Sequence, residues 1–503
     1  MLAKLPSRLQ GRAAALGLAL AAILAVPAAA GAAASPIGTD PFTQATCAGS
    51  ALTNHHTVVE PDTFASGSTI VSAFQVGRIY DGGACTIGFA TSTTNGASWA
   101  SGQLPGITKY AGGPNDRATD ASVAYDAKHN VWLVSSLTLL EAGGVHGNSV
   151  VTSRSTDGGL TWGNPALTAT GGDLDKNWIV CDNTVASPHY GNCYTEWDNH
   201  GAGNLVQMST SSDGGLSWSG AATNGSGVIG GQPVVRPDGN VIVPIDNANE
   251  TAVGAFDSTN GGLTWSAITT ITTIRHHTVA GSLREGPLPS AEIDGAGTVY
   301  VAWADCRFRR SCRTNDIVLS HSTNATGTSW SSVSRVPIDG TSSGIDHFIP
   351  GLAVNKTTSG AGAQLGLTYY FYPPKSTALG VGFISSTNAG STWSAPQTVI
   401  SGMPSTWTAT TSQGRMVGDY ISTSFGSDNL AHGVFATASA PTSGTSCSSV
   451  LDNCAEPVAT FTTGLAASGT ASGAASPVLF AGTGNGSAQS LWNVVDNNGA
   501  KHR

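Results

Sequence analysis

Charged side chains are scarce in this chain, yet many of them gather at one kind of position. Asp, Glu, Lys and Arg make up 11% of the 503 residues, and many stand near the start of a short strand-like stretch. The polar and aromatic residues at these starts are Glu60, Asp120, Asp175, Lys176, Trp178, Arg284, Glu285, Asp346, His347, Arg415 and Asp419. Carboxylic acids can transfer protons, and guanidinium groups pair with carboxylates. These residue types could therefore bind and act on a polar or acidic substrate, provided that the fold brings them together.

The chain that must position these residues is built from a repeated unit. The phrase STDGGLTW, residues 155–162, recurs with variations. Six copies end at Trp99, Trp162, Trp218, Trp265, Trp330 and Trp393, so that successive copies lie 47 to 65 residues apart. Three stretches with the alternation of half-buried strands precede each phrase, and a fourth strand follows it. This spacing is close to that of one four-stranded propeller blade with its loops.

The last unit is incomplete. After Trp393 the first two strands occur once more, within residues 415–438, and a strand-like stretch begins at Pro457. A propeller commonly closes its ring by pairing strands from the two ends of the chain, which would account for the missing strands. We therefore predict an all-β fold, a β-propeller of four-stranded antiparallel blades, with seven blades favoured over six.

The phrase itself has the residue types of a turn. Asp157 can accept hydrogen bonds from backbone N–H groups two residues on, and Gly159 can supply a positive φ. Trp162 offers a large surface to bury against a neighbouring sheet. Other copies replace the Asp by Asn at positions 260, 324 and 388. A catalytic acid could not tolerate that replacement, so we interpret these Asp residues as structural.

The pattern Ser-x-Asp-x-Gly-x-x-Trp resembles the Asp-box, or BNR repeat, of sialidases and related β-propellers. The six near-matches cover approximately residues 57–461. The resemblance implies that the box lies on an outer turn, away from any active site. It also implies that the first strand of each blade lines the central axis, so that the candidate residues would share one mouth. Hydrolases, lyases and binding proteins have this fold, so the box alone does not decide the function.

Sialidases clamp the substrate carboxylate with three Arg, and a Tyr activated by a Glu attacks the sugar while an Asp acts as acid and base. The stretch AEIDGAGTVYVAWADCR, residues 291–307, is similar to a sialidase segment that holds a Glu and an Arg. The implied catalytic residues are Asp120, Glu292 and Tyr420, with Tyr369 or Tyr370 as other possible nucleophiles. The implied substrate-binding residues are Arg284, Arg307, Arg415, Lys176, Trp178 and His347. The Arg-Ile-Pro element of sialidases is missing, and RIYDGG from Arg78 resembles it only weakly.

Three functions stay open at this point. The first is a glycoside hydrolase of exo-sialidase type acting on acidic glycans, which is the one we favour. The second is a polysaccharide lyase, which needs a Tyr or a His such as His276, His277 or His347 as its base. The third is a non-catalytic carbohydrate- or protein-binding propeller with aromatic platforms such as Trp178 and Trp197. We expect no organic cofactor, and no loop has a specific calcium-ligand pattern, although Asp-rich turns leave room for a structural cation.

The N-terminal residues predict export. Lys4, Arg8 and Arg12 precede an apolar run, residues 13–26, and then the small-residue stretch PAAAGAAAS. This is the pattern of a secretory signal peptide, and the run is short for a membrane-spanning helix. We divide the chain into a signal peptide (1–34), a propeller (35–465) and a Gly/Ala/Ser-rich linker with a tail (466–503). The mature protein should be a secreted monomer, extracellular or periplasmic, with a glycan or glycoconjugate substrate.

Cysteine usage and net charge support this reading. An even number of Cys in an exported protein indicates disulfides, and the eight Cys fall into neighbouring pairs. The predicted pairs are Cys181–Cys193, Cys306–Cys312, Cys447–Cys454 and, by elimination, Cys47–Cys85. The formal net charge of −9, without any cluster of Lys and Arg, argues against nucleic acid as a partner.

Overall fold

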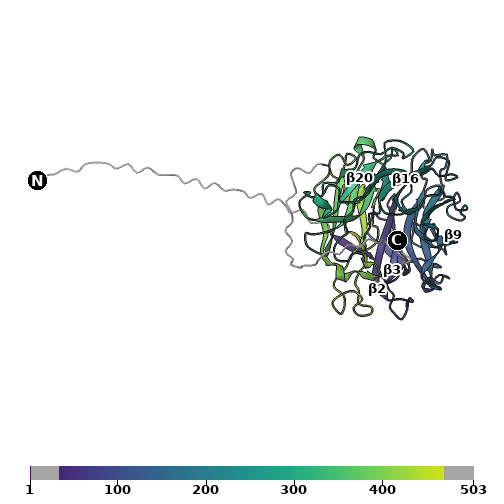
Figure 1. The fold of residues 1–503 in the computed structure, drawn as a ribbon, viewed down its shortest axis with the longest axis horizontal. Coiled ribbons are helices and arrows are strands. Elements are labelled where there is room, and N and C mark those ends of the chain that lie inside the picture. Colours follow the sequence, from purple (N-terminus) through teal and green to yellow (C-terminus); the bar gives the residue numbers. More distant parts are fainter. Residues whose placement is uncertain (2–32, 470–503) are drawn as a thin grey trace. The chain divides into compact units, whose positions relative to one another are not determined.

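The computed structural model describes Met1 and residues 33–469, and in these residues β-strands dominate (Figure 1). The described residues form 31 strands and five short 3-10 helices. The helices are η1 (Lys109–Ala111), η2 (His200–Ala202), η3 (Arg310–Cys312), η4 (Gly360–Gly362) and η5 (Ser405–Trp407). The prediction of an all-β chain is confirmed for this part. The predicted signal peptide and most of the predicted tail lie outside the described residues.

The strands form antiparallel sheets that follow the chain, each from a first strand outward. The first three groups are β2 (Thr53–Ser66), β3 (Thr69–Ile79), β4 (Ala84–Ser92), β5 (Ala100–Gln103); β6 (Arg117–Asp126), β7 (Val131–Leu140), β8 (His146–Ser155), β9 (Ala166–Thr170); and β10 (Leu174–Cys181), β11 (Cys193–Asn199), β12 (Leu205–Ser211). A pairing between Ala84 and Ala118 joins the first two groups into one sheet.

Three further sheets continue this order, and a small hairpin follows them. They are β13 (Val228–Gly231) with β14 (Val234–Val235), β15 (Val241–Asn247), β16 (Ala252–Ser258), β17 (Thr269–Thr273); β18 (Ser290–Ile293), β19 (Val299–Asp305), β20 (Asp316–His321), β21 (Ser334–Arg335); and β22 (Asp346–Val354), β23 (Leu365–Tyr372), β24 (Ala378–Ser386), β25 (Gln397–Pro404). The hairpin is β26 (Ala409–Thr411) with β27 (Gly414–Met416).

The last sheet joins strands from both ends of the described chain. Its order is β28 (Ser422–Phe425), β29 (Leu430–Ala436), β30 (Val458–Phe461) and β1 (Ala34–Gly38), and β31 (Leu465–Ala466) also pairs with β29. In the register of β1 and β30, Ala34 lies opposite Phe461 and Ser35 lies opposite Thr460. The expected pairing of N-terminal and C-terminal strands is therefore confirmed.

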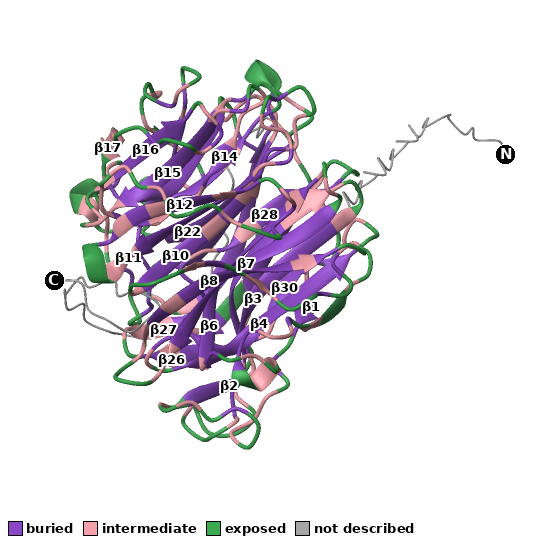
Figure 2. Ribbon diagram, turned by 90° about the vertical axis from the view of Figure 1, so that its right-hand side faces the viewer, coloured by how far each residue is buried: buried purple, intermediate pink, exposed green. Residues whose placement is uncertain are grey.

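We call the strand that comes first along the chain in each group its first strand, and β28 that of the last sheet. These first strands contact one another in chain order. Contacts run from β2 to β6, β10 and β13, continue from β14 to β18, β22 and β28, and return from β28 to β2. Figure 2 shows that strands are buried over most of their length, whereas many of the turns that join them are exposed. The first strands therefore share an interior, and side chains that point from them into it are shielded from water.

Bulges redirect side chains on five of these first strands. In β2, β6, β10, β13 and β22 the register relative to the neighbouring strand shifts at a bulge. The residues at these bulges are Glu60, Asp120, Lys176, Gly230 and Ile349, and all have a φ between 48° and 69°. L-amino acids with side chains rarely adopt this conformation, and bulges re-aim a side chain relative to the strand's alternation. The strained backbone at these positions therefore sets the direction of three charged side chains, those of Glu60, Asp120 and Lys176.

The repeated phrase forms the turn that the sequence predicts, with one difference in its hydrogen bonds. Asp157 Oδ1 accepts from the backbone N–H of Leu160 (3.1 Å) and Thr161 (2.9 Å), three and four residues on rather than two. Hydrogen bonds from Thr161 hold the pKa of Asp157 at about 2. Gly159 has a φ of 81°, and its N–H donates to Ser155 Oγ at 2.9 Å. The Asp is thus a turn acceptor, as expected.

The Trp of the phrase packs against a neighbouring sheet. Trp162 is buried and lies against Phe89, with 5.8 Å between ring centroids. Its indole N–H donates to Gly159 O at 3.0 Å, so the ring is also fixed to its own turn. The same bond recurs in Trp99, Trp330 and Trp393. Trp162, Trp265 and Trp393 are buried, and burial of so large a side chain contributes roughly 1.5–3 kcal/mol or more.

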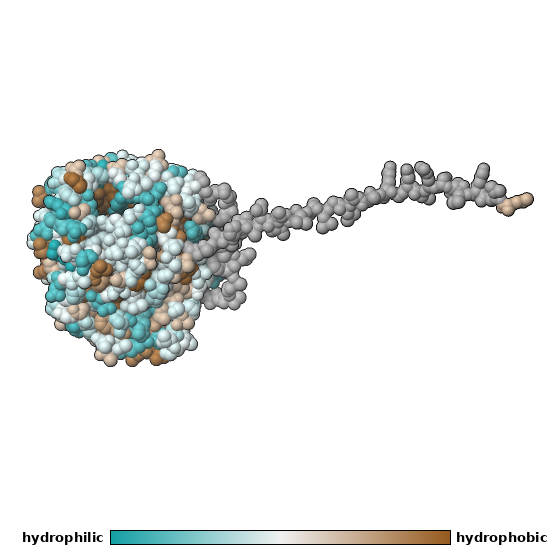
Figure 3. Space-filling model, turned by 180° about the vertical axis from the view of Figure 1, so that it is seen from behind, coloured by the Kyte–Doolittle hydropathy of each residue, from teal (hydrophilic) through white to brown (hydrophobic). Residues whose placement is uncertain are grey.

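All four predicted disulfides are present. They join Cys47 to Cys85, Cys181 to Cys193, Cys306 to Cys312, and Cys447 to Cys454. Disulfides of this kind are typical of exported proteins. In the described part of the chain, no helix has the length and apolar character that a membrane crossing requires. On the face shown in Figure 3, hydrophilic residues predominate and apolar ones are scattered.

Substitution of Asp157 tests the structural role of the phrase. Asp157→Asn should leave stability within about 0.5 kcal/mol, because Asn260 already accepts the equivalent Thr264 N–H at 3.0 Å. Asp157→Ala should cost about 1 kcal/mol, since the two N–H groups lose their acceptor. Urea unfolding followed by tryptophan fluorescence measures both. An equal loss in the two variants would contradict the turn role.

Candidate functional site

Six ionisable side chains from distant parts of the chain meet inside the ring of first strands. We call them the axial ion network: Glu60, Arg78, Asp120, Lys176, Arg284 and Asp419. All are buried, the most exposed being Lys176 at 6%. Three are acids and three are bases, so their formal charges balance. All of them except Arg78 are candidates that the sequence predicts, and Arg78 stands out there only as the start of RIYDGG.

Asp419 is the centre of this network. Lys176 Nζ lies 2.6 Å from Asp419 Oδ2, and Arg284 Nε donates to Asp419 Oδ1 at 2.6 Å while its Nη2 donates to Oδ2. The backbone N–H of Asp419 donates to Glu60 Oε1 at 3.0 Å. Burial alone would raise the pKa of Asp419, but the two cations hold this pKa well below its usual range. The carboxylate is therefore ionised and fully engaged.

The two other acids of the network lie in a different environment. Burial, and then the carboxylates of Asp419 and Asp120, raise the pKa of Glu60 to about 8. Burial and neighbouring Asp175 likewise raise the pKa of Asp120 to about 7. Gln75 connects them, because its Nε2 donates to Glu60 Oε2 and to Thr119 Oγ1, and Thr119 donates to Asp120. These two carboxyls can hold protons near neutral pH.

The three Arg expected to clamp a substrate carboxylate have separate partners. Arg284 binds Asp419, as described above. Arg307 binds Asp305, with Nε 2.9 Å from Oδ1 and Nη2 2.7 Å from Oδ2. Arg415 Nη1 donates to the backbone oxygens of Thr408 (2.9 Å) and Cys447 (3.3 Å). The three-arginine clamp stays a prediction, which the described contacts do not favour.

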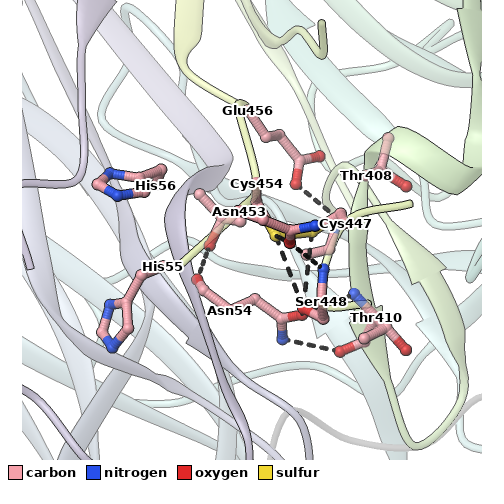
Figure 4. Close-up of a disulfide and its surroundings, with 12 residues drawn as sticks. Asn54, His55, His56, Thr408, Thr410, Cys447, Ser448, Asn453, Cys454 and Glu456 are labelled. Atoms are coloured by element: carbon pink, nitrogen blue, oxygen red, sulfur yellow. Dashed lines mark hydrogen bonds between the residues drawn. A yellow bond between two sulfur atoms is a disulfide. The ribbon is translucent and has the colours of Figure 1, made fainter. Parts of the chain in front are cut away.

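One of the loops that Arg415 contacts is closed by a disulfide. Figure 4 shows the Cys447–Cys454 bond beside Asn54 at the start of β2. Asn54 Nδ2 donates to Thr410 O at 2.9 Å, and Ser448 Oγ donates to Asn54 Oδ1. The fixed loop thus supplies the carbonyl that Arg415 binds, which indicates a structural role for this guanidinium.

Tyr420, the expected nucleophile, lies beside the network but is poorly suited to ionise. Its hydroxyl donates to Ala121 O at 3.3 Å, and its ring meets Trp178 with 5.0 Å between centroids. Burial raises the pKa of Tyr420 well above its usual value, and the surrounding carboxylates add to this effect. Tyr369 and Tyr370 are core residues of β23. The Tyr370 hydroxyl donates to Ala436 O at 2.7 Å, so that, like the Tyr420 hydroxyl, it is bonded to a backbone carbonyl and not to a carboxylate that could activate it.

A cavity of about 340 Å³ opens beyond Trp178. Residues from every first strand line it: Asp62, Thr63 and Phe64 of β2, Val123 of β6, Trp178–Cys181 of β10, Val234–Val235, Ser290–Ile293 of β18, Leu352 of β22 and Ser422 of β28. Glu292 and Trp178 were expected in the site. Asn183, Gln232 and Lys356 also line the cavity but, like Asp62, lack any sequence pattern that could have identified them.

Two carboxyl groups of the cavity have contrasting partners. Asp62 is 3% exposed, and its Oδ2 accepts from Val123 N (2.7 Å) and Ser122 Oγ (3.1 Å). Burial raises the pKa of Asp62 to about 7. Glu292 Oε2 lies 3.7 Å from Lys356 Nζ. Burial raises the pKa of Glu292 as well, and the Lys356 ammonium opposes that shift.

His347, another expected substrate contact, is buried in a separate cluster. Its ring lies 5.6 Å from that of Tyr369, and burial lowers the pKa of His347 to about 4. In the described part of the chain, Asp316, Asp339 and His347 form the one group whose ligand atoms could hold a metal ion. Arg309 and Arg335 already contact both carboxylates. Their charges disfavour a divalent cation at this position.

Comparison with known proteins gives a distant structural likeness. No protein-family model matches the chain, and no curated protein matches its sequence. Among solved structures, an ulvan lyase is 10% identical with a TM-score of 0.49, covering 83% of this chain and 95% of its own. An intramolecular trans-sialidase from Ruminococcus gnavus is 13% identical with a TM-score of 0.41, covering 85% and 97%. A leech intramolecular trans-sialidase is 12% identical, with a TM-score of 0.44 and coverage of 67% and 68%. Similarity at this level identifies neither a family nor a substrate for this chain.

Replacement of Asp419 tests the network. Asp419→Asn should lower the free energy of unfolding by about 3–5 kcal/mol, because Lys176 and Arg284 would stay buried without their counter-charge. The wild type should also lose stability as the pH falls below about 4, the unfolded-state pKa of Asp, because its folded pKa is depressed. The variant should lack this part of the acid loss. Denaturant unfolding between pH 3 and 8 measures both effects.

The matched control for this experiment is Asp238→Asn. Asp238 pairs with Arg236 at 3.2 Å, but its side chain is 46% exposed, so its loss should cost at most about 1 kcal/mol. A similar small loss at Asp419 would show that the network does not hold the first strands together.

Proposed function

We propose that this protein is a secreted, monomeric seven-bladed β-propeller that acts as a glycoside hydrolase on acidic glycans bound in the axial cavity. The observation that carries the proposal is the composition of the cavity. It combines aromatic faces (Phe64, Trp178), amides (Asn183, Gln232), a cation (Lys356) and two carboxyl groups (Asp62, Glu292) in about 340 Å³. Sugar sites need flat apolar surfaces together with a few placed polar groups.

The succession of sheets supports the proposal of seven blades. The first strands contact their neighbours in order, and β28 returns to β2. Strand β1 completes the last sheet, as ring closure would require. Six Asp-box-like turns lie at the ends of successive units, and four disulfides together with the leader-like N-terminal residues support export.

Lys356 is the group that favours an acidic sugar. Its side chain is 49% exposed, and its ammonium lies 3.7 Å from Glu292 and 4.5 Å from the centroid of the Phe64 ring. Such a weakly held ammonium can turn to pair with a carboxylate of the ligand. The cations of the axial ion network cannot do so without leaving Asp419.

Hydrolysis by two carboxyl groups fits the cavity better than hydrolysis by a sialidase mechanism or cleavage by a lyase. An exo-sialidase mechanism would need three converging Arg, yet the contacts of Arg284, Arg307 and Arg415 lie apart. A lyase would need a Tyr or His base in the cavity, whose described lining contains neither residue type. Two carboxyls in one cavity instead suit the usual acid–base scheme of glycoside hydrolases.

The proposal is tested with purified mature protein and a panel of glycans. The panel should contain polyuronates, sialylated oligosaccharides and neutral glucans, with products resolved by mass spectrometry. Saturated sugars released from acidic members alone are expected. Unsaturated products would indicate a lyase, and binding without any product would indicate a non-catalytic propeller. Either result would overturn the hydrolase.

Lys356→Met provides the specific test for recognition of the acid. The KM for an acidic glycan should rise about 10–100-fold, the effect of losing one charge-assisted hydrogen bond, and kcat should fall by a smaller factor because Lys356 lies beside Glu292. Lys128→Met, at an exposed Lys outside the cavity, is the control and should leave both constants unchanged. An unchanged KM in Lys356→Met would remove the acidic-sugar part of the proposal.

A further inference from the structure

We propose that Asp62 is the proton donor of this hydrolase and that Glu292 is the base that activates the attacking water. The inference rests on the proposed function and deepens it, because the sequence resemblance implied a different acid, Asp120, and a Tyr nucleophile. The two carboxyls come from β2 and β18, strands 224 or more residues apart in the chain, and both line the same cavity. Asp120, by contrast, is held in the axial ion network.

The geometry around Asp62 places its proton. Val123 N–H and the Ser122 hydroxyl both donate to Oδ2, so that a proton on this carboxyl belongs on Oδ1. Strand β28 brings Ser422, whose hydroxyl opposes the rise in the pKa of Asp62 together with Val123, Thr63 and Ser122. The segment before β28 brings Tyr420, which burial keeps neutral. Burial outweighs these hydrogen bonds and raises the pKa of Asp62 to about 7. The protonated form is therefore present near neutral pH.

Glu292 lies in a more exposed environment, which suits a general base. It is 25% exposed on its side chain, so water reaches it, and Lys356 lies beside it. Burial raises the pKa of Glu292 and the Lys356 ammonium opposes that rise, and the ionised carboxylate can accept a proton. Two carboxyls of one site with different surroundings are the arrangement that assigns acid and base in glycosidases.

The reaction then balances with one water. Asp62 gives its proton to the glycosidic oxygen as the bond from that oxygen to the anomeric carbon breaks. Glu292 takes a proton from the water whose oxygen forms the new bond to the anomeric carbon. An anionic sugar would repel direct attack by the Glu292 carboxylate, so activated water is the nucleophile and the product has inverted configuration. Proton exchange with solvent restores both carboxyls.

Asp62→Asn is the decisive variant. Its amide oxygen can still accept from Val123 and Ser122, so the fold should be kept, and the melting temperature reports this. We expect kcat to fall about 10²–10⁴-fold, the usual contribution of a general acid, with KM nearly unchanged. The wild-type rate should decline above about pH 7, and that decline should be absent from the residual activity of the variant. The probes are p-nitrophenyl glycosides of glucuronic, galacturonic and sialic acid, beside the oligosaccharide that the panel identifies.

The two kinds of substrate separate a proton donor from a structural residue. A p-nitrophenolate leaving group needs little protonation, so Asp62→Asn should lose far less activity on it than on the oligosaccharide. Glu292→Gln should lose activity on both to a similar extent. The control is Asp182→Asn, because Asp182 is also a buried Asp that accepts from an N–H and a hydroxyl, those of Thr184 and Ser187, and it should keep its rate.

The outcomes distinguish this inference from the proposed function. If the wild type cleaves acidic glycans while Asp62→Asn keeps its kcat and pH profile, the assignment of Asp62 is wrong and the hydrolase stands. If the variant only melts earlier and is equally impaired on both substrates, Asp62 is structural. Product of retained configuration, observed by NMR, would overturn the role of Glu292. If the wild type cleaves nothing, the proposed function itself fails.

Discussion

The buried carboxylate of Asp419 is the contact on which the interior of this protein depends. It binds Lys176 and Arg284, which lie 243 and 135 residues away along the chain. Burying three charges is unfavourable unless each finds its partner, and removing one partner leaves the others uncompensated. The pairing therefore fixes β10 and the segments before β18 and β28 relative to one another, and with them the walls of the cavity.

This use of charge also decides where chemistry can occur. The chain has few charged residues, and the axial ion network buries six of them, with Lys176 and Arg284 both paired to Asp419. A guanidinium that neutralises Asp419 cannot at the same time bind a substrate carboxylate. The cavity beyond Trp178 keeps partly exposed charges, Glu292 and Lys356, whose contact at 3.7 Å is loose. Trp178, which lines the cavity, contacts Tyr420, whose pKa the carboxylates of the network raise further.

The bulges of the first strands explain how one fold can serve both regions. Glu60, Asp120 and Lys176 have a left-handed backbone, which costs about 1–3 kcal/mol at each position. The cost is offset because the redirected side chains complete the network. Asp62 lies just beyond the bulge of β2 and lines the cavity, so the same distortion separates a residue of the network from a residue of the proposed active site.

The sequence by itself determined what depends on neighbours along the chain. The order of strands, the turns around Asp157 and Gly159 and three of the four disulfides follow from short-range patterns, because each needs partners that are near in the chain, and the Cys47–Cys85 pair then follows by elimination. It also selected most members of the axial ion network, since charges at the starts of buried strands are rare. Only the tertiary structure decided that Arg284 binds Asp419 instead of joining Arg415 in binding a ligand carboxylate. It also decided that Asp62 and Lys356 line the cavity. Those contacts join residues far apart in the chain through bulged strands, and no periodicity in the sequence records which way a bulge turns a side chain.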